Sequence, residues 1–448
     1  MTKKLYFQIF ILFALSSHLV AQEPPAKNPF IEKIVSEISA ANMRTAVEKL
    51  VSFGTRHSLS DTLSSTYGIG AARHWIKSEF ERYAQSSNGR MKVEFLESTV
   101  PSSQRIPYPA KIVNVTATLE PKHQDPSRRM LVVSGHYDSR CSNVLDSVKA
   151  APGANDDASG TALVLELARV FSKYEFNTTI IFVAFAGEEE GLLGSTQFAE
   201  TAKQERWNIQ AVLNNDIVGN THGGGGEIES SYVRVFSEAY NPLDTGVTFR
   251  HRNTLGLEND GTARSLARYI KETEERYVPN FEVRLIYRRD RFLRGGDHLP
   301  FHERGFPAVR FTEAKENFNH QHQDVRTEDG TTYGDLPEFM SFEYCANIAR
   351  INAATLASLA LAPTQPANVK IVTSHLEYLT TLHWNKNPEP YAAGYRVRYR
   401  ETTSSQWQNS IYTADTSLTL KISKDDFLFG VQSVDKEGNA SPVSIPLP

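Results

Sequence analysis

Residues 178–186 (TTIIFVAFA) restrict the fold of this chain more than any other segment, because the run is apolar or β-branched throughout. Such a strand is expected to be covered on both faces, which is typical of the central strands of a parallel sheet. Further strands are predicted at residues 111–119, 130–135, 210–213, 281–287 and 307–311. Helical patterns lie between several of these strands, as at residues 161–173. This alternation predicts an α/β domain whose central sheet is mostly parallel and flanked by helices.

The composition changes twice along the chain. Residues 1–21 begin with a short basic region, continue as an apolar run and end in small residues, which is the layout of a secretory signal peptide. Pro363 and Pro366 mark a linker, beyond which short strands with period-2 alternation recur. We therefore expect an α/β domain at residues 22–362 and an all-β, immunoglobulin-like sandwich at residues 363–448.

Composition and charge exclude several classes of function. A net charge of -4 over 448 residues gives no basic footprint for nucleic acid. The apolar run at the N-terminus is shorter than the roughly 20 residues that cross a bilayer, and no later stretch is long enough. We expect the mature chain to be secreted or periplasmic and free of the membrane once the signal peptide is cleaved. Cys141 and Cys345 form no disulfide framework, and the helical pattern around Cys345 favours a buried free thiol.

Acidic and imidazole side chains follow the predicted strands at the point where each strand ends. Three strands run directly into the motifs GHYDS (135–139), GEEEG (187–191) and NND (214–216). A fourth strand is followed a few residues later by His320 and His322. The C-terminal ends of the strands of an open α/β sheet line one crevice, where the ligand site usually lies. These distant segments can therefore bring His, Asp and Glu side chains to one place.

A further acidic loop, PGANDDASG at residues 152–160, directly precedes a helix. Asp, Asn and Ser favour helix N-caps, but beside the other motifs this loop adds a carboxylate that can reach the same crevice. Imidazole and carboxylate ligands suit zinc, and two cations about 3.5–4 Å apart need a bridging carboxylate. A neighbouring Glu that binds neither ion can act as the general base. The pair Glu188-Glu189 suits this division of labour, although an isolated acidic triplet is more often a solvated turn.

The ordered motifs GHYDS, PGANDDASG, AGEEEGLLGS, LNND and NHQHQD resemble those of the secreted co-catalytic zinc aminopeptidases. Relatives of that family include glutamate carboxypeptidases and glutaminyl cyclases. The similarity runs over residues 131–324, with flanks that extend to residue 361. The resemblance implies that residues 22–362 form a zinc peptidase domain that binds two zinc ions and hydrolyses the N-terminal residues of peptide substrates.

The resemblance also implies a ligand set. One zinc would be held by His136 and Asp216, the other by Glu189 and His320, and Asp156 would bridge the two ions. His320 is favoured over His322 because the family's ligand His lies four residues before an Asp, as His320 does before Asp324.

Further residues take roles from the same resemblance. Glu188 would be the general base, and Asp138 would orient the imidazole of His136. The bond between Asp156 and Asp157 would be a cis peptide, which is rare outside proline. Asp297 and His298 are candidates either for substrate contact or for a structural role.

The C-terminal part resembles a fibronectin type III domain, in which Trp384 and Tyr395 would belong to the core. A module of this kind is expected to serve as a spacer or as a docking surface for a polymer or a cell surface, without catalysis.

Two alternatives to an aminopeptidase stay open. A zinc carboxypeptidase that removes C-terminal acidic residues would need cationic groups over the substrate carboxylate, and the basic stretch at residues 288–294 could supply them. A solvated face is the other interpretation of that stretch. The second alternative is a non-catalytic peptide-binding module on the same scaffold. Such a module would be recognised by the loss of a metal-ligating residue or of the general base from the motifs.

Overall fold

The computed structural model describes residue 23 and residues 26–447. The predicted signal peptide at residues 1–21 lies outside the described residues. Within them, no helix is both long enough and apolar enough to cross a membrane. Cys141 and Cys345 are both buried and free, as the sequence favoured for Cys345.

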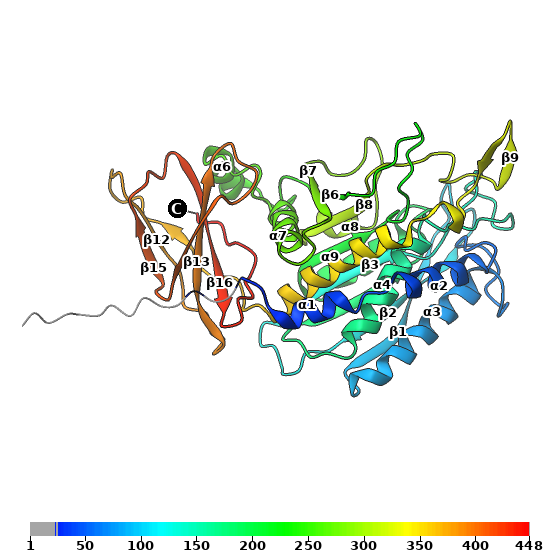
Figure 1. The fold of residues 1–448 in the computed structure, drawn as a ribbon, viewed down its shortest axis with the longest axis horizontal. Helices are drawn as coiled ribbons and strands as arrows, with labels where there is room; N and C mark the ends of the chain where they lie inside the picture. Colours follow the sequence, from blue (N-terminus) through cyan, green and yellow to red (C-terminus); the bar gives the residue numbers. More distant parts are fainter. Residues whose placement is uncertain (1–22, 24–25, 448) are drawn as a thin grey trace, which may run out of the picture.

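A central sheet of eight strands, in the order β1-β2-β4-β3-β5-β8-β6-β7, runs through the larger part of the molecule (Figure 1). The strands are β1 (Met91–Val100), β2 (Ala110–Leu119), β3 (Arg129–His136), β4 (Thr179–Phe185), β5 (Asn208–Asn215), β6 (Tyr232–Phe236), β7 (Glu282–Ile286) and β8 (Ala308–Glu313). The four central strands β4, β3, β5 and β8 are parallel. The pairs β1–β2, β2–β4 and β6–β8 are antiparallel. The predicted α/β fold is confirmed, and its parallel strands form the centre of a mixed sheet.

The side chains of β4 explain why its sequence is apolar throughout. Ile180, Phe182 and Ala184 belong to one hydrophobic core. Ile181, Val183 and Phe185 belong to a second core on the opposite face. Successive side chains of a strand point to opposite faces of the sheet, so a strand between two helical layers has no polar face.

Helices cover both faces of the sheet. The larger core takes side chains from α1 (Pro29–Ser36), α2 (Ala40–Val51), α3 (Gly68–Ala84), α4 (Ala158–Phe171), α7 (Thr262–Tyr277) and α9 (Phe342–Leu361). The smaller core takes side chains from α5 (Leu193–Gln204) and α8 (His298–Glu303). A further helix, α6 (Gly246–Thr254), and the hairpin of β9 (Arg326–Glu328) and β10 (Thr331–Tyr333) lie outside these two layers.

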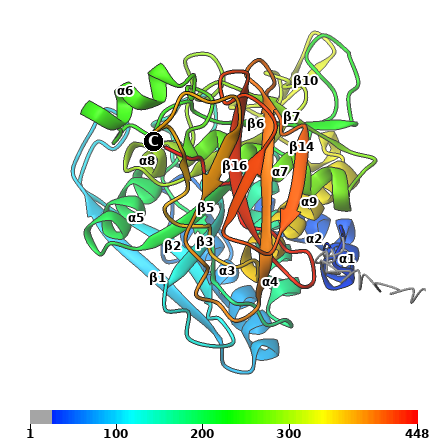
Figure 2. The ribbon, with the colours of Figure 1, turned by 90° about the vertical axis from the view of Figure 1, so that its left-hand side faces the viewer.

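Two antiparallel sheets follow α9 and pack face to face (Figures 1 and 2). One contains β11 (Lys370–Ile371), β12 (Thr380–His383) and β15 (Ser417–Leu420); the other contains β14 (Asn409–Thr413), β13 (Ala392–Glu401) and β16 (Phe427–Asp435). Trp384 and Tyr395 lie in the core between them, as predicted. The expected all-β sandwich is confirmed; its likeness to a fibronectin type III domain stays a prediction.

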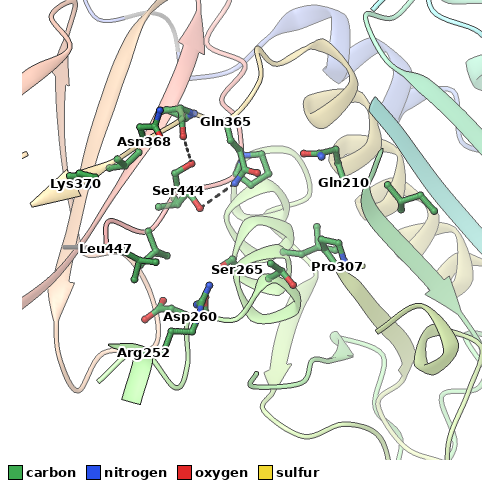
Figure 3. Close-up of a pocket in the computed structure, with 18 residues that line it drawn as sticks. Gln210, Arg252, Asp260, Ser265, Pro307, Gln365, Asn368, Lys370, Ser444 and Leu447 are labelled. Atoms are coloured by element: carbon green, nitrogen blue, oxygen red, sulfur yellow. Dashed lines mark hydrogen bonds between the residues drawn. The ribbon is translucent and has the colours of Figure 1, made fainter. Parts of the chain in front are cut away.

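Buried ion pairs hold the sandwich against the α/β part. Asp260, just before α7, accepts hydrogen bonds from Arg268 of α7 (2.5 Å) and from Arg400 of β13 (2.8 Å). All three side chains are at most 2% exposed. Arg398 of β13 adds a pair of hydrogen bonds to Glu272 of α7. Asp260 also lines a cavity of about 560 Å³ between the two parts of the chain (Figure 3).

Replacing Asp260 with Ala should lower the free energy of unfolding by about 3–5 kcal/mol, because it leaves two buried guanidinium groups without a carboxylate. Urea denaturation of the full chain measures the change. Glu282→Ala is the matched control: Glu282 pairs with Arg284 where both side chains are nearly half exposed, so the loss should be below about 1 kcal/mol. Equal losses in the two variants would contradict the importance of the buried pairs.

Candidate metal centre

The ends of the central parallel strands converge on one site. His136 is the last residue of β3, and Asp216 directly follows β5. Glu188 and Glu189 lie in the turn after β4, and Asp156 lies in the loop before α4. Because β4, β3 and β5 are neighbours in the sheet, their C-terminal ends place these side chains together, as expected for an open α/β sheet.

Two groups of three side chains have potential ligand atoms within 4.8 Å of one another: His136, Glu188 and Asp216, and Asp156, Glu189 and His322. Asp156 is a member of the second group, and it also faces the first group. Its Oδ1 is 3.2 Å from Nε2 of His136, and its Oδ2 is 3.0 Å from Nε2 of His322. Nε2 of His322 is also 3.0 Å from Oε1 of Glu189. A carboxylate that presents one oxygen to each group has the arrangement of a bridging ligand.

The structure places His322 in this site, and the prediction of His320 is wrong in this respect. The ring of His320 stacks on Phe339, with a centroid distance of 3.7 Å and an interplanar angle of 5°. It lines a separate pocket together with His222. The backbone of His322 is left-handed, with φ of 52°, and a spacing rule does not anticipate such a turn.

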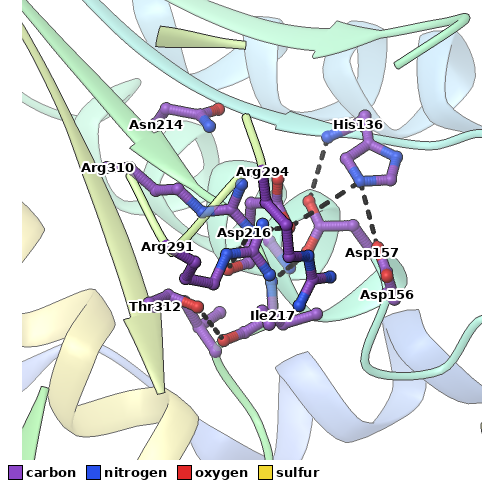
Figure 4. Close-up of polar contacts among 12 residues, drawn as sticks. His136, Asp156, Asp157, Asn214, Asp216, Ile217, Arg291, Arg294, Arg310 and Thr312 are labelled. Atoms are coloured by element: carbon purple, nitrogen blue, oxygen red, sulfur yellow. Dashed lines mark hydrogen bonds and ion pairs between the residues drawn. The ribbon is translucent and has the colours of Figure 1, made fainter. Parts of the chain in front are cut away.

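The carboxylate of Asp157 joins the segments that carry the donors. Its Oδ2 accepts a hydrogen bond from the backbone N–H of His136 (3.0 Å) (Figure 4). Its Oδ1 accepts from the N–H groups of Gly160 (3.0 Å) and Ile217 (3.2 Å). A Cβ at Gly160 would lie 2.1 Å from a backbone oxygen, so the close approach of α4 to the end of β5 requires glycine. The peptide bond that precedes Asp157 is cis, as predicted.

Asp138 lies behind His136, as the resemblance implied. Its Oδ1 is 3.5 Å from Nδ1 of His136, and its Oδ2 accepts a hydrogen bond from the N–H of Glu189 (3.0 Å). The ring of His136 therefore presents Nε2 to the carboxylates of the site. Asp335 gives similar support without a motif that predicts it. It accepts hydrogen bonds from the N–H groups of Asn155 (2.8 Å) and Asp156 (2.7 Å).

Two fully buried arginines also support the site without belonging to any motif. Arg310 of β8 forms an ion pair with Asp216, in which its guanidinium nitrogen lies 2.6 Å from Oδ1, and so fixes this carboxylate (Figure 4). The only sequence signal for Arg310 is a charge inside an apolar strand. Arg56 donates to the carbonyl oxygens of Tyr137 (2.6 Å) and Pro152 (2.6 Å), which connects the loops after β3 and before α4.

Asp297 and His298 lie outside the cavity described below. Both are at most 2% exposed. Nε2 of His298 donates to the carbonyl oxygen of Arg289 at 2.9 Å. Burial lowers the pKa of His298 to about 4, so the ring stays neutral. The geometry gives His298 a structural role.

The electrostatics of the site fit bound cations. Burial raises the pKa of Glu188 well above its ordinary value, and the nearby carboxylate of Asp216 adds to this effect. Nε2 of His136 and Oε1 of Glu189 are buried, and their close contacts with Asp156 and His322 lack hydrogen-bond geometry, so neither atom has a hydrogen-bond partner among the described residues. Buried polar atoms are rarely left without partners. Imidazole and carboxylate groups gathered in this way are ligands that zinc prefers.

A cavity of about 580 Å³ opens onto these donors. Its walls contain five of the six residues of the two groups, all but His136, together with Gln321 and four arginines, Arg105, Arg140, Arg291 and Arg294. Gln321 is only 5% exposed, and its Nε2 has no hydrogen-bond partner in the described part of the chain. The donors thus form the floor of a space large enough for one or two amino-acid residues of a ligand.

Comparison with known proteins identifies the family. The model of peptidase family M28 matches residues 114–338, a range that contains all the donors. The chain belongs to peptidase family M28. This M28 chain is 46% identical over 425 residues to a probable zinc metalloprotease of Leptosphaeria maculans, covering 95% of this chain and 98% of the relative. It is 45% identical to a probable zinc metalloprotease of Pyrenophora tritici-repentis, covering 96% of this chain and 89% of the relative.

Solved structures share the fold of this M28 chain. LapB from Legionella pneumophila aligns with a TM-score of 0.54 at 20% identity, covering 76% of this chain and 78% of that chain. An aminopeptidase from Aneurinibacillus sp. strain AM-1 aligns with a TM-score of 0.51 at 16% identity, covering 74% of this chain and 96% of that chain. At these identities the likeness concerns the fold alone.

Replacing His322 with Ala should weaken zinc binding by about a hundredfold or more, since even residues that only orient metal ligands change the affinity by about 10–100-fold. Zinc retained per chain after dialysis against a competing chelator measures the effect. His320→Ala is the matched control and should retain zinc as the unaltered protein does, because its ring stacks on Phe339. A larger loss in the His320 variant would restore the assignment based on spacing.

Proposed function

We propose that this M28 chain is a zinc-dependent exopeptidase with two zinc ions, in the first instance an aminopeptidase. The observation that carries the proposal is the position of Asp156, whose two carboxylate oxygens face separate donor groups on the floor of one cavity. The curated relatives described as probable zinc metalloproteases support the metal. The structural neighbour described as an aminopeptidase supports the type of substrate.

In this proposal His136 and Asp216 would hold one zinc, Glu189 and His322 would hold the other, and Asp156 would contribute to both sites. Zinc ions there would supply Lewis acidity toward the substrate carbonyl group and would lower the pKa of a bound water. The protein holds the donors in place through the hydrogen bonds of Asp138, Asp157 and Asp335 and through the ion pair of Arg310 described above.

Glu188 is the proposed general base. Its carboxylate lies beside His136 and Asp216 and lines the cavity, so it can accept the proton of the attacking water and return it to the leaving amine. We assign a second catalytic role to Gln321, because its buried Nε2 has no hydrogen-bond partner in the described part of the chain. It can donate a hydrogen bond to the carbonyl oxygen as negative charge develops there.

The purified mature protein should contain two zinc ions per chain and should cleave aminoacyl anilides and peptides with a free amino terminus. Removing zinc with a chelator should abolish hydrolysis, and adding zinc should restore it, because the Lewis acidity that zinc would supply at these donors would be lost and regained. Metal analysis and hydrolysis rates in the same sample measure both. Cleavage confined to N-blocked peptides would favour a carboxypeptidase, and full zinc occupancy without hydrolysis would favour a binding role.

Glu188→Gln should lower kcat by about 10²–10⁴-fold, which is the usual contribution of a general base. Zinc content should stay at two ions per chain, because Glu188 is not a proposed ligand. Steady-state kinetics and metal analysis of the same preparation test both statements. Near-normal kcat would rule out Glu188 as the base, whereas loss of one zinc would show that Glu188 is a ligand.

We also propose that residues 1–21 direct export and are removed. The basic start, apolar run and small residues before Gln22 support this proposal. N-terminal sequencing of the protein from its natural host should find Gln22 as the first residue outside the cytoplasm. A chain that retains Met1 would contradict export by this route.

A further inference from the structure

The cavity above the donors has an unusual balance of charge. Its acidic residues are Asp156, Glu188, Glu189 and Asp216, all of which belong to the two donor groups. Among the described residues, its other ionisable wall residues are His322, another donor, and four arginines. Two divalent cations would offset the four carboxylates, and the remaining wall would then be cationic. A ligand in this cavity would contact both the donors and this cationic wall.

Arg105 and Arg140 carry the least compensated charge. Arg105, in the loop between β1 and β2, donates to the carbonyl oxygen of Glu189 at 2.7 Å. Arg140, in the loop after β3, donates to the carbonyl oxygens of Cys141 (3.2 Å) and Ser142 (3.3 Å). Neither forms an ion pair with a carboxylate in the part of the chain that the structure describes. Carbonyl oxygens position a guanidinium group but leave its net charge available to a ligand.

The arginines of the facing loop differ in this respect. Arg291 and Arg294, between β7 and α8, both contact Glu316, at 3.3 and 2.7 Å. Arg291 also pairs with Asp290, so its charge is largely engaged. Arg294 is 30% exposed and shares Glu316 with two other guanidinium groups. This wall therefore also retains positive charge, which strengthens the field from Arg105 and Arg140.

We propose that the cavity selects substrates that carry a carboxylate next to the scissile bond, and that Arg105 and Arg140 bind this carboxylate. The inference rests on the proposed peptidase function and adds its substrate class. A guanidinium group matches a carboxylate with parallel N–H donors, and such charge-assisted hydrogen bonds are among the strongest in proteins. The carboxylate comes either from an acidic side chain or from the C-terminus of a short peptide, and both present the same chemistry to the two arginines.

Two pairs of probes distinguish these sources in the zinc-loaded full chain. Glu-p-nitroanilide and Gln-p-nitroanilide differ only in a side-chain carboxylate, and Leu-Leu and Leu-Leu-amide differ only in the C-terminal carboxylate. In at least one pair the acid should be cleaved with roughly ten- to hundredfold higher kcat/KM than its amide, since a hydrogen bond to a charged group contributes that much. The pair that shows the preference identifies the source.

The double variant Arg105→Gln, Arg140→Gln should lose this preference and retain hydrolysis of the amides. The readout is the ratio of kcat/KM for the acid to kcat/KM for its amide. Loss of the hydrogen bond from Arg105 to Glu189 slows both members of a pair equally and leaves this ratio unchanged. Arg140→Gln alone avoids that contact and should lower the ratio in part. Arg288→Gln is the matched control, since Arg288 is exposed and lies outside the cavity wall. It should leave the ratio unchanged.

Equal rates for acid and amide in both pairs, or a preference that survives in the double variant, would overturn the inference while the peptidase function stands. If no peptide is cleaved, the proposed function fails, and ligand binding then decides the inference. Calorimetry with glutarate and glutaramide measures recognition of a carboxylate without turnover. Tighter binding of glutarate that weakens about tenfold or more in the double variant supports carboxylate recognition, and equal binding of the two probes overturns it.

Discussion

The carboxylate of Asp157 is the contact on which the geometry of the site depends. It is fully buried and joins the N–H groups of His136, at the end of β3, and Ile217, just after β5, to the first turn of α4. Without it, three buried backbone donors would lose their acceptor, and each such loss costs about 1–3 kcal/mol. The same contact sets the distance between the strand ends, and so the distance between His136 and Asp216. The hydrogen bonds of Asp157 therefore contribute both to the stability of the fold and to the geometry of the site.

Around this centre, buried charges hold loops that carry no regular structure of their own. Arg56 connects the loop after β3 with the loop before α4. Asp335 accepts hydrogen bonds from the N–H groups of Asn155 and Asp156 in the second of these loops. Arg310 reaches Asp216 from the neighbouring strand β8. These contacts hold the loops, and with them the donors, in place before a ligand binds. Such preorganisation favours reactions in which charge develops at a fixed point.

Much of this arrangement could be predicted from the sequence, because apolar strands that end in His, Asp or Glu are a local signal. The run at residues 178–186 predicted a strand covered on both faces, and the structure confirms it. His136, Asp156, Glu188, Glu189 and Asp216 lie together, as their motifs suggested. The spacing to Asp324 favoured His320 over His322, and spacing carries no information on the left-handed backbone at His322. Arg310 and Asp335 act through contacts between distant segments, and no spacing within the chain encodes these.

The ion pairs of Asp260 with Arg268 and Arg400 have a consequence for the molecule as a whole. An appended module on a flexible tether samples a volume that grows with tether length. Here the sandwich is held against α7 by ion pairs between side chains that are at most 2% exposed. These buried pairs therefore favour one angle between the sandwich and the α/β part, and with it one orientation of the sandwich relative to the mouth of the cavity above the donors. The distance that the sandwich extends from the α/β part is set by this contact. Lengthening the segment around Pro363 would therefore not increase that distance.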